Sequence, residues 1–196
     1  GFGIKLGRLG KGRFGERVRE RLVVDHPQLL ELFEPVLEAR QALLVQEKVL
    51  DAKVVTMARA DAVCRVLMST PGVGPVTALA FMSGVDDPSR FAKSRDVGAH
   101  FGLTPRLYQS GEICRSGRIS KCGDAMVRSL LFEAALSLMT RTKKWSALKA
   151  WGLRVAQRRG MRRAVVAVAR RLAVILHRMW IDNTEFKWGK TGDVIA

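Results

Sequence analysis

The sequence predicts an all-α fold in which a long N-terminal helical arm of the coiled-coil type precedes a helical domain. That domain is expected to contain a helix-hairpin-helix-like element and one small irregular loop or hairpin. Apolar residues recur every three or four positions along most of the chain, which is the spacing of a buried helix face. The spacing is lost between Gly102 and Ser120, where glycines are interspersed with Leu, Tyr and Ile. The 196 residues are 47% hydrophobic, enough for one domain with a core and an appendage.

Four segments follow from these patterns. Residues 1–12 are basic and punctuated by glycine, and they predict a flexible linker. Residues 13–60 predict the helical arm, residues 61–181 the domain, and residues 182–196 a fraying tail with few core residues. Because the chain opens on a glycine-rich run and not on Met, we expect it to be a piece of a longer protein.

The arm carries a heptad pattern, interrupted by two polar residues. Its positions, separated by alternating steps of four and three, are Leu32, Val36, Ala39, Leu43, Gln46, Leu50, Lys53 and Met57. Pro35 predicts a kink or a restart, because proline lacks the N–H that an inner helical turn needs. So narrow an apolar stripe on so long a helix favours an antiparallel or intermolecular coiled coil, and we expect a homo-oligomer formed through residues 32–57. The alternative is a helix packed on its own domain.

The domain is predicted to be a series of helices separated by turns. In order, the helices are expected over residues 61–69, 76–83, 94–101, 123–141, 145–158 and 161–181. The irregular segment lies between the third and the fourth of them. The last helix gathers its apolar residues within one arc and leaves its arginines outside that arc.

The charge of the chain indicates a polyanionic partner. Lys and Arg number 34 against 18 Asp and Glu, which gives a formal net charge of +16. Basic side chains release the counterions condensed on phosphate, so we expect a nucleic acid, and DNA first. No stretch reaches the roughly 18 apolar residues of a membrane helix, so we expect no membrane partner.

The three cysteines argue against a disulfide framework. Their number is odd and no Cys-x-x-Cys occurs, so a reducing cytoplasm is the expected location. Cys114 and Cys122 with His100 fit no standard zinc spacing. Asp86 and Asp87 are better explained as caps of the segment at Ser89. We therefore predict no metal site and no cofactor in this chain.

The turn from Pro71 to Pro75 predicts a phosphate grip. Gly72, Val73 and Gly74 lie between two short apolar helices, as in a helix-hairpin-helix motif. Glycines let the backbone approach a phosphate closely, and the N–H groups at a helix start point at it. The alternative is a plain turn between two packed helices.

Serines surrounded by cations form the second candidate site. Ser110, Ser116 and Ser120 stand among the cations Arg106, Arg115, Arg118, Lys121 and Arg128. A serine that attacks a phosphodiester needs cations to stabilise the charge that develops on the phosphate. Spacing alone favours the alternative, in which these serines are turn and cap residues.

A basic surface is predicted near the C-terminus. No Asp or Glu occurs from Ala134 to Ile181, so the cations of that stretch have no acidic neighbours in sequence. The arginines expected to contact nucleic acid are Arg158, Arg159, Arg162, Arg163, Arg170 and Arg171. Trp151 and Trp180 are interpreted as core residues.

Several short motifs together resemble a known family. They are Pro71-Gly72-Val73-Gly74, Gly98-x-x-Phe101-Gly102-Leu103-Thr104-Pro105, Tyr108-x-Ser110-Gly111, and Ile119-Ser120-Lys121-x-Gly123-Asp124-x-x-x-Arg128. The combination resembles the C-terminal domain of IS110/IS116/IS902 transposases. The likeness covers roughly residues 61–150 well, and the arm before them plausibly.

The resemblance implies DNA transposition or site-specific recombination by a bacterial cytoplasmic enzyme. It implies a serine nucleophile, which maps best onto Ser110 and second onto Ser120. It also implies a possible guide RNA and a separate RuvC-like domain whose acidic residues hold Mg²⁺. Nothing in this chain matches that domain, so the chain is expected to be the DNA-joining half and inactive alone. The alternative is a non-catalytic helix-hairpin-helix DNA-binding or oligomerisation module.

Overall fold

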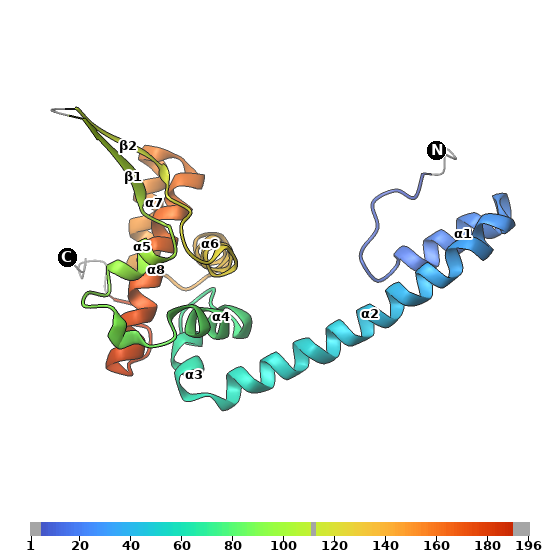
Figure 1. Cartoon of the computed structure of the whole chain (residues 1–196), viewed down its shortest axis with the longest axis horizontal. Coiled ribbons are helices and arrows are strands. Elements are labelled where there is room, and N and C mark those ends of the chain that lie inside the picture. The colour runs from blue at the N-terminus through green and yellow to red at the C-terminus, as the bar shows by residue number, and fades with distance from the viewer. Residues whose placement is uncertain (1–4, 111–112, 190–196) are drawn as a thin grey trace. The chain divides into compact units, whose positions relative to one another are not determined.

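The computed structural model describes residues 5–110 and 113–189, and the side chains of residues 25 and 109–116 are outside this description. Its contacts divide the chain into two compact units, Gly1–Lys53 and Val54–Ala196. The described residues form eight α-helices and one two-stranded sheet, which confirms the predicted all-α class (Figure 1).

The first unit is a helical hairpin. Helix α1 (Phe14–Asp25) and helix α2 (Pro27–Ala60) are joined at His26. Val18 and Leu22 of α1 pack with Leu37 of α2 in a small apolar cluster. The Arg19 guanidinium donates to the Glu34 carboxylate from Nε at 2.9 Å and from Nη2 at 2.7 Å, which ties the two helices together.

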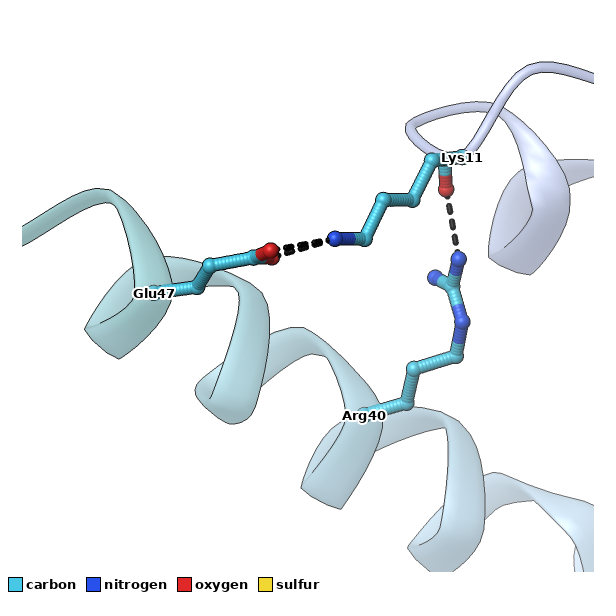
Figure 2. A network of polar contacts seen from close by, with 3 residues as sticks. All are labelled: Lys11, Arg40 and Glu47. Carbon is cyan, nitrogen blue, oxygen red and sulfur yellow. Dashed lines mark hydrogen bonds and ion pairs between the residues drawn. The ribbon is translucent and has the colours of Figure 1, made fainter. Parts of the chain in front are cut away.

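Two expectations about this unit do not match the structure. Helix α2 starts at Pro27 and continues through Pro35 as one helix, because Glu34 and Leu37 on either side are held against α1. The described part of the expected flexible linker folds back onto α2. Lys11 pairs with Glu47 through Nζ at 2.5 Å, and Arg40 donates to the Lys11 carbonyl oxygen at 2.5 Å (Figure 2).

The second unit is built around helix α8 (Met161–Asp182). Its buried side chains are Ala164, Val165, Val168, Ala169, Leu172, Ala173, Leu176, His177 and Met179. The helices that pack on it are α3 (Ala62–Met68), α5 (Asp96–His100), α6 (Ala125–Thr140) and α7 (Ala147–Arg159), with a 3₁₀ turn η1 at Pro88–Arg90. Helix α4 (Pro75–Val85) packs on α3 and α6. His177 is satisfied in this core by the Pro88 carbonyl at 2.9 Å and the Ser94 hydroxyl at 3.0 Å.

The irregular segment is a β-hairpin, which is one of the two predicted forms, a loop or a hairpin. Strand β1 (Pro105–Ser110) pairs antiparallel with strand β2 (Ile113–Ile119), with an irregularity between Pro105 and Leu107. Figure 1 shows the hairpin projecting from the helices of its own unit. The hairpin therefore presents side chains that the helical core does not cover.

The expected fraying is not seen for residues 183–189. Phe186 is buried, and its N–H donates to the Ser69 hydroxyl at 2.9 Å. The Trp188 carbonyl accepts the Ala147 N–H at 3.0 Å. Two aromatic anchors are enough to hold this short segment on the core, a contribution that a low count of apolar residues concealed. Residues 190–196 lie outside the described part.

Candidate functional site

Three of the cations predicted near the serines meet at one surface pocket. Its lining residues are Arg106, Tyr108, Arg118, Ile119 and Lys121, around a volume of about 250 Å³. The pairing of Pro105 with Ile119 brings Arg106 of β1 close to Arg118 of β2, and Lys121 follows directly after the hairpin. All three cationic side chains are exposed. The pocket therefore offers concentrated positive charge to a ligand from solvent.

Tyr108 belongs to this pocket, a role that the sequence reasoning missed. A Cβ on Gly117 would lie 2.7 Å from Cε2 of Tyr108, so the ring lies against the bare backbone of the paired strand. The Tyr108 side chain remains more than half exposed. Tyr108 pairs with Arg115, and Gly117 is its diagonal neighbour on the other strand, a relation that only the strand register reveals.

The segment after β2 is laid tightly on the end of α5. The Ser120 N–H donates to the Thr104 carbonyl at 2.9 Å, and the Lys121 N–H to the Gly102 carbonyl at 3.1 Å. Gly102 and Gly123 both have positive φ, and a Cβ on either would lie within 2.4 Å of a backbone atom. Lys121 also has a positive φ, of 57°. The backbone that carries Lys121 is thus fixed in a conformation that few sequences accept.

Arg128 has a different environment from the other predicted cations. Its Nη1 donates to the Cys122 carbonyl at 2.9 Å and to the Phe101 carbonyl at 3.2 Å, and contacts the Gly123 carbonyl at 3.5 Å. Arg106 makes a related contact, donating from Nη2 to the Ser120 carbonyl at 3.0 Å. Arg128 therefore joins α6 to the segment after β2, and its side chain is only partly exposed.

The structure treats the candidate serines unequally. Ser110 is the last residue of β1 and its backbone pairs with Ile113, but its side chain, like those of Arg115 and Ser116, lies outside the described part. Ser120 is half-buried and lies between two residues that line the pocket, Ile119 and Lys121. Its hydroxyl accepts the Cys122 N–H at 3.5 Å.

The turn between α3 and α4 joins two short helices, and its assignment to a helix-hairpin-helix motif stays a prediction. Gly72 has a φ of +88°, and a Cβ there would lie 2.3 Å from the Ala134 carbonyl oxygen of α6. Val73 is buried in the core. Close packing on α6 is thus sufficient to explain Gly72. Gly74 has open space around it at the start of α4, and phosphate contact at this turn stays a prediction.

The predicted basic surface is concentrated where α7 meets α8. Arg158 and Arg159 end α7, and Arg162 and Arg163 start α8, on either side of Gly160; all four side chains are exposed. Arg154, one turn earlier, is exposed as well and was not predicted. Within residues 5–110 and 113–189 none of these five arginines forms an ion pair.

Arg170 and Arg171 belong to a different environment. The stem of Arg170 lies on α5, where a Cβ on Gly98 would be 3.0 Å from its Cγ. The Arg171 guanidinium lies 4.7 Å from the ring centroid of Trp151. Trp151 and Trp180 pack against the core, as predicted.

Asp87 and Asp124 of this unit cap helical segments. Asp87 accepts the Ser89 hydroxyl at 2.7 Å and the Ser89 N–H at 2.8 Å, and these hydrogen bonds hold the pKa of Asp87 below its ordinary value. Asp124 accepts the Met126 and Val127 N–H groups at the start of α6. Among the described residues no group of three or more His, Cys, Asp or Glu side chains could hold a metal ion. No helix in the described ranges is long and apolar enough to cross a membrane.

Comparison with known proteins relates the sequence of this segment to one family. Residues 64–151 match the family described as Transposase IS116/IS110/IS902. A putative transposase y4pF/y4sB of Sinorhizobium fredii is 33% identical over 88% of this chain and 46% of its own length. The transposase for insertion sequence element IS1111A of Coxiella burnetii is 36% identical over 68% of this chain and 37% of its own. A probable family 20 transposase of Pseudomonas aeruginosa is 30% identical over 81% of this chain and 47% of its own.

The matches cover only part of each relative and only part of the candidate site. The chain spans less than half of the length of each of these three relatives. The pocket residues and Arg128 lie inside the segment that matches the family, whereas the arginines around Gly160 lie outside it.

Proposed function

We propose that the protein takes part in DNA transposition, because residues 64–151 match the IS116/IS110/IS902 family of transposases. The proposed step is DNA joining through a serine, with Ser110 as the nucleophile and Ser120 as the second candidate. The serine oxygen bonds to phosphorus while the bond from phosphorus to a deoxyribose oxygen breaks. The serine proton passes to solvent, and the leaving oxygen takes up a proton.

The observation that carries this proposal is the meeting of Arg106, Arg118 and Lys121 around one pocket within the family segment. A phosphodiester gains negative charge on its equatorial oxygens as the nucleophile attacks. Positive groups already in place stabilise that charge without reorganising. Ser120 adjoins the pocket directly. Ser110 ends the strand that supplies Tyr108, two residues further along, or roughly 7 Å at the usual rise of a strand.

We assign Arg128 to positioning and not to charge stabilisation. Its contacts with the Phe101 and Cys122 carbonyls keep the segment of Ser120 and Lys121 in register with the hairpin. In the proposed reaction its loss would displace Lys121 and leave the pocket incomplete.

The remaining partners follow from charge and shape. The five arginines around Gly160 are proposed to contact phosphates of DNA or of a guide RNA. The exposed heptad stripe of α2 is proposed to pair with a second copy of the chain. The family resemblance implies Mg²⁺ in a separate acidic domain, and no step here involves a metal bound by this chain. The activity is proposed for the bacterial cytoplasm, where the DNA substrate lies.

The nucleophile is tested in a full-length protein that includes this chain. Ser110→Ala and Ser120→Ala are compared for a covalent protein–DNA adduct that survives denaturation. We expect Ser110→Ala to abolish the adduct and Ser120→Ala to retain it. The reverse result transfers the role to Ser120, and an adduct in the double variant rules out both serines.

The pocket is tested by binding across salt concentrations. Arg118→Ala is expected to weaken duplex DNA binding and to lower the salt slope by about 0.9, the value of one phosphate contact. Arg21, an exposed arginine of α1, provides a matched control. Normal binding by all serine variants without any adduct in the parent would instead favour the non-catalytic binding module.

A further inference from the structure

The connection between α6 and α7 displays one tryptophan to solvent. Trp145 is 53% exposed, whereas Trp151, Trp180 and Trp188 pack against the core. A large aromatic side chain on an otherwise charged surface is costly to leave in water, and such residues are enriched where proteins bind partners. Of the four tryptophans, all of them in the described ranges, Trp145 is therefore the one that does not pack against the core.

The backbone around Trp145 is held from both sides. Ser146 is buried, and its hydroxyl accepts the Lys149 N–H at 3.2 Å. The Lys149 ammonium donates to the Thr142 carbonyl at 2.5 Å, which closes the loop over the first turn of α7. The Ala147 N–H is bonded to the Trp188 carbonyl at 3.0 Å. Trp145 is thus presented from a fixed backbone, so binding to it costs little ordering entropy.

The surroundings of Trp145 are cationic. Arg141, Lys143 and Lys144 are exposed in the same six-residue connection. The Lys144 ammonium lies 4.1 Å from the ring centroid of Trp188, and no ion pair is made by these three residues within the described ranges. The sequence holds no acidic residue from Ala134 to Ile181. A partner for this loop must combine negative charge with a flat apolar face.

We propose that the α6–α7 connection binds single-stranded nucleic acid, with one unpaired base stacked on Trp145. Arg141 and Lys143 contact the phosphates on either side of that base. A base in a duplex is already stacked between its neighbours, so the loop discriminates in favour of single strands. This binding site does not depend on the proposed serine chemistry, which takes place at the hairpin pocket.

The test compares two substitutions at one position. Trp145→Phe keeps an aromatic ring, whereas Trp145→Leu keeps apolar bulk without a ring. Binding to a fluorescein-labelled dT strand is measured by anisotropy, beside a duplex of the same length. Since stacking on an aromatic side chain contributes about 1–3 kcal/mol per base, Trp145→Leu should weaken strand binding about 5- to 150-fold. Trp145→Phe should weaken it less, and duplex binding should change in neither variant.

The control is Ile181→Ala, which removes an apolar side chain of matching exposure, 52%, outside the loop. It should bind the strand like the parent. An unlabelled dT strand should also quench tryptophan emission in the parent more than in Trp145→Phe. Unchanged strand binding in Trp145→Leu, or an equal loss on strand and duplex, would overturn the inference. If either result is found while the full-length protein still forms the serine adduct, only the single-strand binding proposal fails, and the serine proposal stands.

Discussion

Helices α2 and α8 both repeat apolar residues every three or four positions, but their surroundings are opposite. Among its described side chains, α8 buries nine, whereas α2 buries only Leu37 and Ala58 over 34 residues. On α2 the heptad positions Leu32, Val36, Leu43, Leu50 and Met57 are exposed. The difference shows that periodicity predicts which face is apolar and not what covers it. Neighbours packed around α8 supply its cover, whereas in the described part of the chain the buried positions of α2 are confined to Leu37, against α1, and Ala58, in the core of the second unit.

The largest expected difference between the two helices is in unfolding free energy, when a buried side chain of α8 is removed. Leu172→Ala removes a fully buried side chain of α8 and should lower the free energy of unfolding by about 2–5 kcal/mol. Leu43→Ala on α2 removes a side chain that is 70% exposed, so in the monomer it should change that free energy by about 0.5 kcal/mol or less. Urea unfolding of both variants at low protein concentration measures the difference. Equal losses would mean that the two helices are covered to the same extent.

Gly72 and Gly74 allow the same comparison with a smaller expected effect, because one is closely packed and the other has open space around it. Gly72→Ala places a Cβ against the Ala134 carbonyl at a φ of +88°, and should cost roughly 1–3 kcal/mol of unfolding free energy. Gly74→Ala meets no atom within 4 Å and should cost much less. If Gly74→Ala then weakens duplex DNA binding while leaving thermal unfolding unchanged, phosphate contact at this turn is supported. A stable Gly72→Ala protein would contradict the packing explanation.

The exposed stripe of α2 is tested by charge. If a second copy covers it, Leu43→Asp places a carboxylate in the seam and should reduce the mass measured by sedimentation. Lys48→Asp, at an exposed position outside the heptad stripe, is the control and should leave the mass unchanged. A Leu43→Asp protein of parental mass would discount the arm as an interface.

The smallest expected effect concerns pH and the hairpin of α1 and α2. The hydrogen bond from Arg19 holds the pKa of Glu34 below its ordinary value. This contact therefore stabilises the hairpin above the ordinary pKa, and the contribution is lost as pH falls through the lowered value. Amide exchange in α1 should rise in acid, and Glu34→Gln should remove that dependence. Glu31→Gln, a neighbouring exposed carboxylate, should retain it.

At the candidate site, the sequence indicated the residues and the structure assigned their roles. The cluster of Arg106, Arg118 and Lys121 was visible as cations near serines, and the hairpin brought all three to one pocket. Arg128 was grouped with them by chemistry, although backbone carbonyls occupy its guanidinium. Tyr108 and Arg154 were missed, because strand register and the choice of which helix face stays exposed are not local properties of sequence.

By itself, the sequence determined the all-helical class, the break at the hairpin, the excess of positive charge and the family motifs. These depend on residues near one another in the chain, where spacing and composition are sufficient. The tertiary structure decided that α8 is buried and α2 is not, that Gly72 lies against α6, and that Phe186 anchors the segment after α8. Each of those outcomes depends on a contact between distant segments, and burial is set by what lies across the contact.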